Sequence, residues 1–533
     1  MMAGRDQTGG QLVCAALATA GCEVMFSVSG NQILPVYDAA GDAGLRIIHM
    51  RHESAAAYAA AAYAEIAGGI GVVLTSAGPG FLAALQGVAA ARTMELPVLL
   101  LSGDSPVSQR GKGAFQELDQ STVAGAVCKA TFSIDQASKI PAVIARAHRT
   151  ATAGIPGPVH VSLPGDVLSS AAQPAEVEQP HEMPPLTAEE RSIVDAMAEH
   201  ISIAQRPLIL ARPSAARGVA GEHLGALARS LGIEPVVIEA PRGLADLKNA
   251  SISSHFVESD CVLVLAPADF ALGFLAPDTV AQDGTILLVD TEGDPAAERD
   301  LALHLRADLP SVLERLRSTT GFSGQVDPDW ARLWPLPEPP GPERRQDNSI
   351  HPLAVSEAVR AAIRPDDIIV LDGGEFCQWI RLGLRDLPNP ALWNGKIGAI
   401  GGGIPMAVGA AVAAGPSGRR VISIMGDGAA GYHLSEFETM DRYGLPVTII
   451  IGNDARWAAE WHLQIARYGP DRTFETELTN ARYDRVAAGF EASGEHITDA
   501  DDLPGAIQEA LGRQSPTCIN VEVAALPSPA AMS

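Results

Sequence analysis

Two polar residues in the C-terminal third follow consecutive apolar runs that we predict to be neighbouring strands. The run "RVISIM" ends at Met425 and precedes the turn Gly426-Asp427-Gly428, and the run "VTIII" leads to Asn453. A right-handed crossover brings both strand ends to one edge of a parallel sheet, where α/β folds bind ligands. Oxygen ligands beside a glycine turn and a helix N-terminus suit Mg²⁺ that bridges a diphosphate.

A glutamate in the N-terminal third is the second candidate for chemistry. In "LRIIHMRHESAAAYAAAAYAE" we predict a strand to Met50 and an Ala-rich packed helix, with Glu53 at its start. One interpretation is a first-turn glutamate that stabilises the helix dipole. The other is a catalytic carboxylate whose environment tunes its proton affinity.

The predicted strands and helices that position these residues occur in two segments of similar sequence. Residues 72–104 align with residues 421–454, so that Gly78 matches Asp427 and Pro97 matches Pro446. Both segments read as strand, glycine turn, helix and strand. Between the strands of the second copy we predict a helix from about residue 430 to 442, whose inner face carries Tyr432, Phe437 and Met440. Two related domains could therefore build one site between them.

Two linkers rich in proline and charge, residues 169–190 and 334–349, divide the chain. The segments 1–180, 190–335 and 350–533 each alternate short apolar runs with helical stretches, which indicates three doubly wound α/β domains with parallel sheets. The middle segment has no Gly-x-Gly-x-x-Gly fingerprint after its apolar runs, so the sequence gives no positive sign of a dinucleotide there.

Composition narrows the class of protein. The net charge of −25 argues against nucleic acid or an anionic membrane as a partner. The six cysteines are scattered without a CxxC spacing, and we expect buried, reduced thiols rather than disulfides or zinc. The N-terminus lacks a secretory signal and no apolar run is long enough to cross a bilayer, so we expect a cytoplasmic protein.

The turn at Asp427 followed by Asn453 resembles the signature of enzymes that use thiamine diphosphate (ThDP). The resemblance implies that Mg²⁺ is bound by Asp427, Asn453 and the carbonyl of Ala455. It also implies cofactor contacts at three further positions, namely Gly426, Gly428 and Ala429. The family's usual Asn-Asn pair is Gly452-Asn453 here, which retains the ligating asparagine.

The same resemblance covers essentially the whole chain, as a pyrimidine-binding, a middle and a diphosphate-binding domain. It implies that Glu53 activates the aminopyrimidine ring, that the carbonyl of Gly398 meets the 4′-amino group, and that Ile400 is the wedge that bends the cofactor. Gly78 lies in the glycine turn "TSAGPG" near the pyrimidine pocket, and residues 372–376 lie where diphosphate contacts are expected.

Segments outside these motifs resemble benzaldehyde lyase and acetolactate synthase. "GAFQELDQ" implies that Phe115 and Gln116 line the substrate channel, and Gln116 is also a candidate catalytic residue. "SVSGNQIL" places Asn31 and Gln32 where some relatives carry histidine, and glutamine does not titrate near neutrality.

The segment after the metal turn, "NDARWAAEWHLQ", carries the last candidates. It implies that Glu460 shuttles a proton, although a solvated helix glutamate is an equal alternative. Trp457 and Trp461 belong either to the core or to the wall of an aromatic pocket.

From the resemblance we expect a ThDP- and Mg²⁺-dependent carbon–carbon lyase or carboligase for 2-hydroxyketones or 2-keto acids. It implies a homodimer or homotetramer with active sites at subunit interfaces. The alternatives are a 2-hydroxyacyl-CoA lyase, an oxalyl-CoA decarboxylase, a simple 2-keto acid decarboxylase, a flavin-linked pyruvate oxidase and a non-catalytic cofactor-binding protein. We do not expect FAD, because only residues 241–260 separate two middle-domain strands. The C-terminal tail has no basic residues to hold the phosphates of CoA.

Overall fold

The chain forms two compact units in a computed structural model. One unit comprises residues 1–152, 157–178 and 339–533, and the other comprises residues 153–156 and 179–338. The structure describes residues 6–175, 185–238, 255, 257–265, 284–291, 301–319, 326–331, 348–384, 387 and 389–528. Residues 176–184 of the first predicted linker and 334–347 of the second lie outside these ranges, and the domain boundaries at 180–190 and 335–350 stay predictions.

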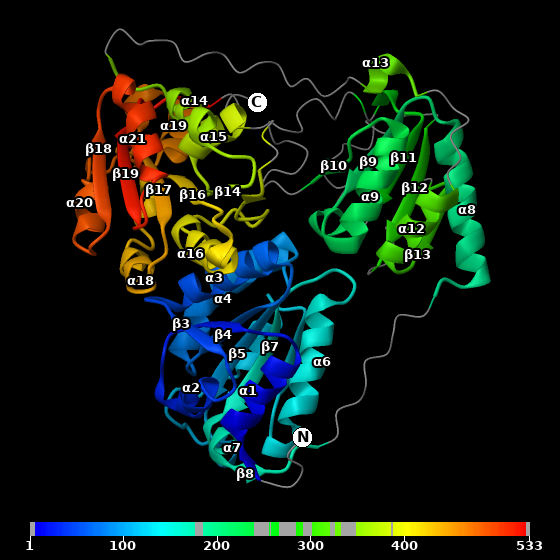
Figure 1. Ribbon diagram of the computed structural model, residues 1–533, viewed down its shortest axis with the longest axis vertical. Coiled ribbons are helices and arrows are strands. Elements are labelled where there is room, and N and C mark those ends of the chain that lie inside the picture. The colour runs from blue at the N-terminus through cyan, green and yellow to red at the C-terminus, as the bar shows by residue number, and fades with distance from the viewer. Residues whose placement is uncertain are drawn as a thin grey trace. The chain divides into compact units, whose positions relative to one another are not determined.

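The N-terminal domain contains a parallel sheet of six strands (Figure 1). In spatial order the strands are β3 (Arg46–His49), β2 (Val24–Ser27), β4 (Gly71–Thr75), β5 (Val98–Asp104), β7 (Val159–Pro164) and β6 (Ala130–Ser133). Its helices are α1 (Gly9–Thr19), α2 (Leu34–Ala40), α3 (Glu53–Ala67), α4 (Pro79–Met94), α5 (Gln120–Ala124), α6 (Ile140–Thr152) and α7 (Gly165–Ser169). A short antiparallel pair, β1 (Gln7–Thr8) with β8 (Ala171–Ala172), joins the two ends of the domain.

The C-terminal domain repeats this strand order. Its six parallel strands are β15 (Ala391–Leu392), β14 (Ile368–Leu371), β16 (Val421–Gly426), β17 (Val447–Asn453), β19 (Thr517–Glu522) and β18 (Ser493–Ile497). In both sheets the strands occur in the spatial order second, first, third, fourth, sixth and fifth along the chain. The segments that match in sequence supply the third and fourth strands of each sheet, which fits the inferred duplication.

The helices of the C-terminal domain differ in one place from the predicted pattern. They are α14 (Pro352–Ala362), α15 (Glu375–Leu384), α16 (Gly403–Ala414), α17 (Asp427–Ala430), α18 (Glu436–Arg442), α19 (Ala458–Tyr468), α20 (Tyr483–Ala488) and α21 (Leu503–Ala510). The single helix predicted over 430–442 was wrong, because the chain leaves helical geometry between α17 and α18. Phe437 and Met440 are fully buried as predicted, but Tyr432 is 50% exposed. The side chain of His433 binds the carbonyl of Gly401 and the hydroxyl of Ser54, and these tertiary contacts compete with a continuous helix.

The unit formed by the N- and C-terminal domains has one hydrophobic cluster that runs through both domains and a further cluster within each domain. The central strands of both sheets are largely buried and rich in Val, Ile and Leu, as parallel sheets covered on both faces require, whereas β3, β6 and β18 at the sheet edges are partly exposed. One hydrophobic cluster joins residues of α3 and β4 with residues of α16, β14 and β17. Figure 1 shows α3, α4 and α16 lying between the two sheets.

Small residues bring these three helices together. The residues from Ala55 to Ala62 of α3 are all completely buried. A Cβ atom added to Gly409 of α16 would lie 2.0 Å from the carbonyl oxygen of Ala59, and one added to Gly87 of α4 would lie 2.7 Å from Cβ of Ala57. The backbones therefore touch with no room for larger side chains.

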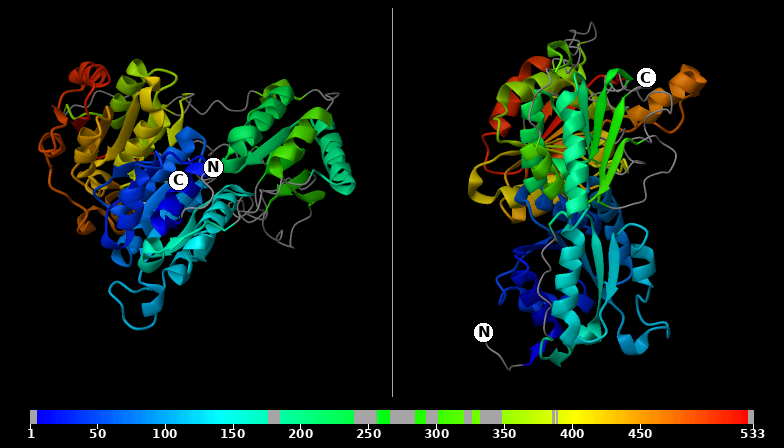
Figure 2. Two further views of the ribbon diagram at one scale, coloured as in Figure 1. Left: turned by 60° about the horizontal axis from the view of Figure 1, so that its bottom comes forward. Right: turned by 90° about the vertical axis from the view of Figure 1, so that its right-hand side faces the viewer.

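The middle domain has a five-stranded parallel sheet within the described residues. Its order is β10 (Val236–Val237), β9 (Pro207–Ala211), β11 (Cys261–Leu265), β12 (Thr285–Asp290) and β13 (Leu303–Arg306). The helices are α8 (Ala188–Ile203), α9 (Gly218–Leu231), α12 (Leu309–Thr319) and α13 (Pro328–Ala331), and Figure 2 (right) shows α8 running alongside the green strands. Most of the segment 241–260, on which the expectation about FAD rests, lies outside the described residues.

Two compositional expectations can be compared with the structure. All six cysteines are free and buried, as predicted. Burial raises the pKa of each of these thiols, for example to about 12 for Cys128, so they are neutral near pH 7. In the part of the chain that the structure describes, no helix is both long and apolar enough to cross a bilayer.

The contact at Gly409 gives the first prediction. The substitution Gly409→Ala should lower the free energy of unfolding by about 2 kcal/mol, because the new methyl group meets backbone rather than a flexible side chain. Gly505→Ala in α21 is the matched control, since nothing lies within 4 Å of its Cβ position; it should stay within about 1 kcal/mol of the parent. Urea denaturation of the full chain measures both, and equal effects would contradict the tight helix contact.

Candidate functional site

Asp427 and Asn453 lie at the same edge of the C-terminal sheet, as predicted. Strands β16 and β17 are parallel neighbours with Gly426 opposite Gly452, so the two residues end adjacent strands. Asp427 is 2% exposed, and burial raises the pKa of its carboxyl to about 6. Its Oδ2 atom is buried and has no hydrogen-bond partner. This orphaned oxygen indicates a site that a cation would complete.

The segment after β17 folds back over this carboxylate. The backbone N–H groups of Ala455 and Arg456 face Asp427 and favour its charged form. Ala455 has a left-handed backbone with φ +55°, and its carbonyl accepts a hydrogen bond of 2.6 Å from the Leu478 N–H. That bond uses one lone pair of the carbonyl predicted to bind the metal and leaves the second.

Asn453 is held by its amide nitrogen. Nδ2 donates to the side chains of Asn480 and Asn520 and to the carbonyl of Ala481 at 2.9–3.2 Å. Oδ1 accepts the N–H of Ala455 at 3.1 Å and keeps one lone pair free for a cation. The network therefore fixes the orientation of the amide, with Nδ2 held by the protein and Oδ1 beside the Ala455 N–H.

A second carboxylate at this edge was missed in the sequence. Burial, followed by repulsion from Asp427, raises the pKa of Asp454 to about 7. Because the charge of Asp427 raises the proton affinity of the neighbouring Asp454, a divalent cation at this edge would stabilise both carboxylates in their charged forms. Within the described residues no group of three or more His, Cys, Asp or Glu side chains is arranged to hold a metal. The predicted site differs from such a group, because it combines one carboxylate with an amide oxygen and a carbonyl. The residues therefore fit Mg²⁺.

The glycine-rich segment 394–403 is anchored to the same edge by Asp372. This buried carboxylate accepts the N–H groups of Gly401 and Gly403 and the side chain of Asn394. Burial raises the pKa of Asp372 despite these hydrogen bonds. In the sequence Asp372 was expected at the diphosphate, whereas in the structure its carboxylate holds the glycine-rich segment.

The anchored segment places Ile400 beside the end of β14. Cγ2 of Ile400 lies 2.7 Å from the position that a Cβ on Gly373 would occupy, so only glycine fits there. Gly398 is exposed and has φ +66°. Ile400 is partly buried against the core, which is compatible with a wedge that a bound molecule would touch.

Trp457 covers the glycine turn at Asp427. A Cβ on Gly428 would lie 2.7 Å from the indole ring. Trp461 instead stacks under the guanidinium of Arg456 at 4.9 Å, and Glu460 is exposed in the first turn of α19. Of these three candidates, only Trp457 contacts the turn within the described contacts.

The N-terminal candidates gather at the corresponding edge of the other sheet. Glu53 is the first residue of α3, and His52 caps that helix by accepting the N–H of Ser54. Oε1 of Glu53 lies 3.1 Å from the position of a Cβ on Gly80, and Cβ of Ser76 lies 3.4 Å from that position. The carboxylate therefore reaches over the glycine turn that follows β4.

Two of the predicted pocket residues are joined on this edge. Nε2 of Gln32 donates to Oε1 of Gln116 at 2.7 Å, and the hydroxyl of Ser76 donates to Gln32 at 2.5 Å. Gln116 has φ +61°, an uncommon conformation for a residue with a side chain, and its carbonyl lies against Gly78. Asn31 and Phe115 are exposed, and Phe115 reaches 73%. The structure thus places Gln32, Gln116 and Gly78 beside one another, and their roles in a pocket stay predictions.

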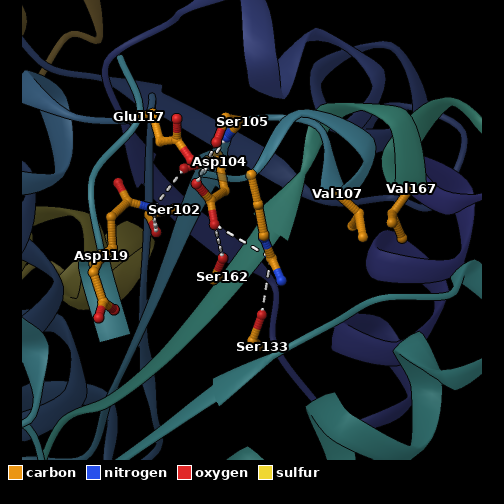
Figure 3. A network of polar contacts seen from close by, with 12 residues as sticks. Ser102, Asp104, Ser105, Val107, Glu117, Asp119, Ser133, Ser162 and Val167 are labelled. Carbon is orange, nitrogen blue, oxygen red and sulfur yellow. Dashed lines mark hydrogen bonds and ion pairs between the residues drawn. The ribbon is translucent and has the colours of Figure 1, made fainter. Parts of the chain in front are cut away.

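The loop that carries Gln116 is fixed by a buried carboxylate at the end of β5 (Figure 3). Asp104 accepts from the Ser162 hydroxyl at 2.6 Å and from the Ser105 N–H at 2.8 Å. Arg110 bridges Asp104 and Ser133 at 3.4 and 3.0 Å. These contacts hold residues 105–110 to the sheet and so restrict where Gln116 can lie.

Comparison with known proteins adds independent information. The model "Thiamine pyrophosphate enzyme, N-terminal TPP binding domain" matches residues 7–123, and "Thiamine pyrophosphate enzyme, C-terminal TPP binding domain" matches residues 372–521. The first range contains Glu53 and Gln116, and the second contains Asp427 and Asn453.

Curated relatives match nearly the whole chain. The acetolactate synthase large subunit of Mycobacterium tuberculosis is 29% identical over 96% of this chain and 95% of the relative. The oxalyl-CoA decarboxylase of Escherichia coli is 29% identical over 97% and 94%. The 2-hydroxyacyl-CoA lyase 2 of Mus musculus is 28% identical over 91% and 84%.

The contact between Gly428 and Trp457 gives the second prediction. Gly428→Ala should destabilise the protein by about 2 kcal/mol, because a rigid indole cannot move aside as a flexible chain would. Gly431→Ala in the same turn is the control, since its Cβ position has 3.6 Å to the nearest atom; it should cost less than about 1 kcal/mol. Repeating Gly428→Ala in a Trp457→Ala background should remove most of the cost, and an unchanged cost in urea denaturation would exclude the clash.

Proposed function

Because the chain belongs to the thiamine pyrophosphate enzymes, we propose that it makes or cleaves carbon–carbon bonds beside a carbonyl group with ThDP and Mg²⁺. The proposed substrates are 2-hydroxyketones or 2-keto acids. The single observation that supports the metal-dependent part best is the buried, unpartnered Oδ2 of Asp427 at the end of β16.

The C-terminal edge would hold the diphosphate end of the cofactor. We propose Asp427, Asn453 and the carbonyl of Ala455 as ligands of Mg²⁺. The proposed contacts with the diphosphate are Gly426, Gly428 and Ala429. The indole of Trp457 occupies the space where a Cβ of Gly428 would lie, so the turn at Gly428 has a fixed position beside Asp427. The backbone N–H groups of such a turn at a helix N-terminus favour an anion.

The glycine-rich segment would hold the rings. Its anchor, Asp372, fixes Gly401 and Gly403 by hydrogen bonds of 2.7–3.1 Å, so the neighbouring Ile400 and the carbonyl of Gly398 have defined positions. Preorganisation of this kind orients a bound cofactor without an ordering cost at each turnover.

When bound, ThDP supplies the nucleophilic carbon and the electron sink of the reaction. The chain's own contribution is to hold a proton at Glu53, which we propose as the partner of a ring nitrogen of the pyrimidine. Ser76 and Gly80 lie near this carboxylate, and Glu53 is partly exposed at the start of α3. A carboxylate in such a position acts in general acid–base catalysis.

We further propose that Glu53 serves cofactor held by the C-terminal domain of a second copy of the chain. The two sheets have the same strand order but carry different residues at corresponding strand ends, Gly78 in one and Asp427 in the other, so one site can combine an edge of each. An assembly with closed two-fold symmetry then has two such sites, as a dimer or as a dimer of dimers.

Gln32, Gln116 and Ser76 would bind the carbonyl substrate beside Glu53. Their hydrogen bonds supply neutral donors and acceptors for a substrate oxygen without adding charge. Asn31, Phe115 and Trp461 remain candidates for the outer part of the pocket, and Glu460 is a candidate for proton transfer.

The roles of the two carboxylates predict separable defects. Glu53→Gln should lower turnover by at least about 100-fold with ThDP affinity nearly unchanged, because general acid–base catalysis is lost while the diphosphate contacts remain. Asp427→Ala should instead weaken Mg²⁺-dependent ThDP binding by at least about tenfold. Calorimetry with ThDP, with and without Mg²⁺, measures the affinities. Binding by the parent protein that needs no Mg²⁺, or a Glu53→Gln protein with full activity, would refute these roles.

A substrate screen tests the reaction class. Mass spectrometry with ThDP, Mg²⁺ and a panel of 2-keto acids, acyloins and acyl-CoA compounds should show conversion of the first two groups. Turnover restricted to CoA esters would favour the chemistry named for the oxalyl-CoA decarboxylase or 2-hydroxyacyl-CoA lyase relatives. The variant Glu460→Gln should change the pH profile of the converted substrate. An unchanged profile would remove Glu460 from the mechanism and leave it a surface residue.

A further inference from the structure

Two stretches of the chain far apart in sequence run antiparallel and are joined by polar contacts at both ends. They are residues 47–54, which lead into α3, and residues 433–443, which contain α18. At one end, the Tyr443 hydroxyl accepts the His49 N–H at 2.8 Å and lies 3.3 Å from the Ile47 carbonyl, to which it donates. Arg442 donates to the His49 carbonyl at 2.7 Å.

The centre of this contact is a buried glutamate. Glu436 has 0% exposure and accepts the backbone N–H of Arg51 at 3.1 and 3.4 Å through its two oxygens. Thr439 donates to the same carboxyl group at 2.6 Å. The charged side chains that face it are Arg51 and Glu438, and burial raises the pKa of Glu436 to about 7.

A buried histidine makes the contact at the other end. Nε2 of His433 lies 2.8 Å from the Ser54 hydroxyl, and Nδ1 lies 2.6 Å from the Gly401 carbonyl. Because a carbonyl only accepts, Nδ1 carries the proton, and the neutral ring accepts from Ser54 through Nε2. Burial lowers the pKa of His433 to about 4, so the ring is neutral near pH 7. His433 thereby ties the start of α3 to the glycine-rich segment next to Ile400.

These contacts hold residues on both sides of Glu53 in the sequence. The backbone of Arg51 is held by Glu436, and the side chain of Ser54 is held by His433. We propose that His433 and Glu436 are positioning residues for Glu53, and that residues 433–443 fix the carboxylate that the N-terminal domain presents to the cofactor. Neither residue was a candidate in the sequence, and neither contacts Glu53 through a described hydrogen bond.

The catalytic importance of His433 and Glu436 rests on the proposed function of Glu53. The contact between residues 47–54 and 433–443 is independent of that proposal. A carboxylate at the first residue of a helix moves with the backbone that precedes it. When the backbone at Arg51 and the side chain of Ser54 are held, the carboxylate of Glu53 can move only by changes of its own side-chain rotamer.

The experiment compares Glu436→Met with Glu436→Gln in the full chain. Methionine leaves the Arg51 N–H unpaired, whereas glutamine still accepts it. Amide hydrogen exchange without cofactor should be at least about tenfold faster over residues 47–56 in Glu436→Met. Exchange in Glu436→Gln should stay within about threefold of the parent. With ThDP and Mg²⁺ added, deuterium exchange at the thiazolium C2 should slow about tenfold in Glu436→Met, while ThDP affinity changes less than about threefold.

Glu375→Met is the matched control for amide exchange, because Glu375 is also buried and accepts a backbone N–H, that of Ser528. It should leave residues 47–56 unchanged. The variant Ser54→Ala tests the other end of the contact and should also speed exchange there, which keeps the test open if Glu436→Met does not fold. Parent-like amide exchange in Glu436→Met and Ser54→Ala, or an equal loss in Glu436→Gln, would overturn the proposal. A parent protein that binds no ThDP would refute the proposed function instead, and amide exchange would then decide the positioning contact alone.

Discussion

The close packing of α3 against α4 and α16 is the contact on which the rest of this structure depends. Alanine on one side and glycine on the other let the backbones touch, so that two sheets share one hydrophobic core. Glu53 begins α3, and the glycine-rich segment ends where α16 begins at Gly403. The packing of the helices therefore fixes the starting points of both segments that bear the candidate residues.

The repeated strand order lets corresponding positions of the two domains be compared. In each domain the third and fourth strands end at the edge that carries the candidate residues, but the turn after the third strand differs. The N-terminal copy has Gly78, which lets the loop with Gln116 approach, and the C-terminal copy has Asp427, whose oxygen is left unpartnered. One copy thus offers space and hydrogen bonds, and the other offers charge for a cation.

Sequence patterns predicted the elements with strong local signals. Strand ends at Asp427 and Asn453 and the helix at Glu53 follow from apolar runs and glycine turns, whereas the hydrogen bond between Gln32 and Gln116 was not predicted. The interruption before α18 and the anchoring role of Asp372 were missed, because both depend on partners distant in sequence. His433 and Glu436 belong to this second group, since a histidine and a glutamate near a helix give no local sign that they are buried against residues 47–54.

The alanines of α3 have a mechanical consequence. Alanine has no side-chain rotamers, so the buried stretch from Ala55 to Ala57 and from Ala59 to Ala62 cannot absorb a displacement by repacking, as leucine or methionine would. A shift at one end of this helix must be passed on to the other end as movement of a stiff rod. A core of alanines therefore adapts less to local changes than a core of leucine or methionine, and it couples the positions of the two ends of α3 more tightly.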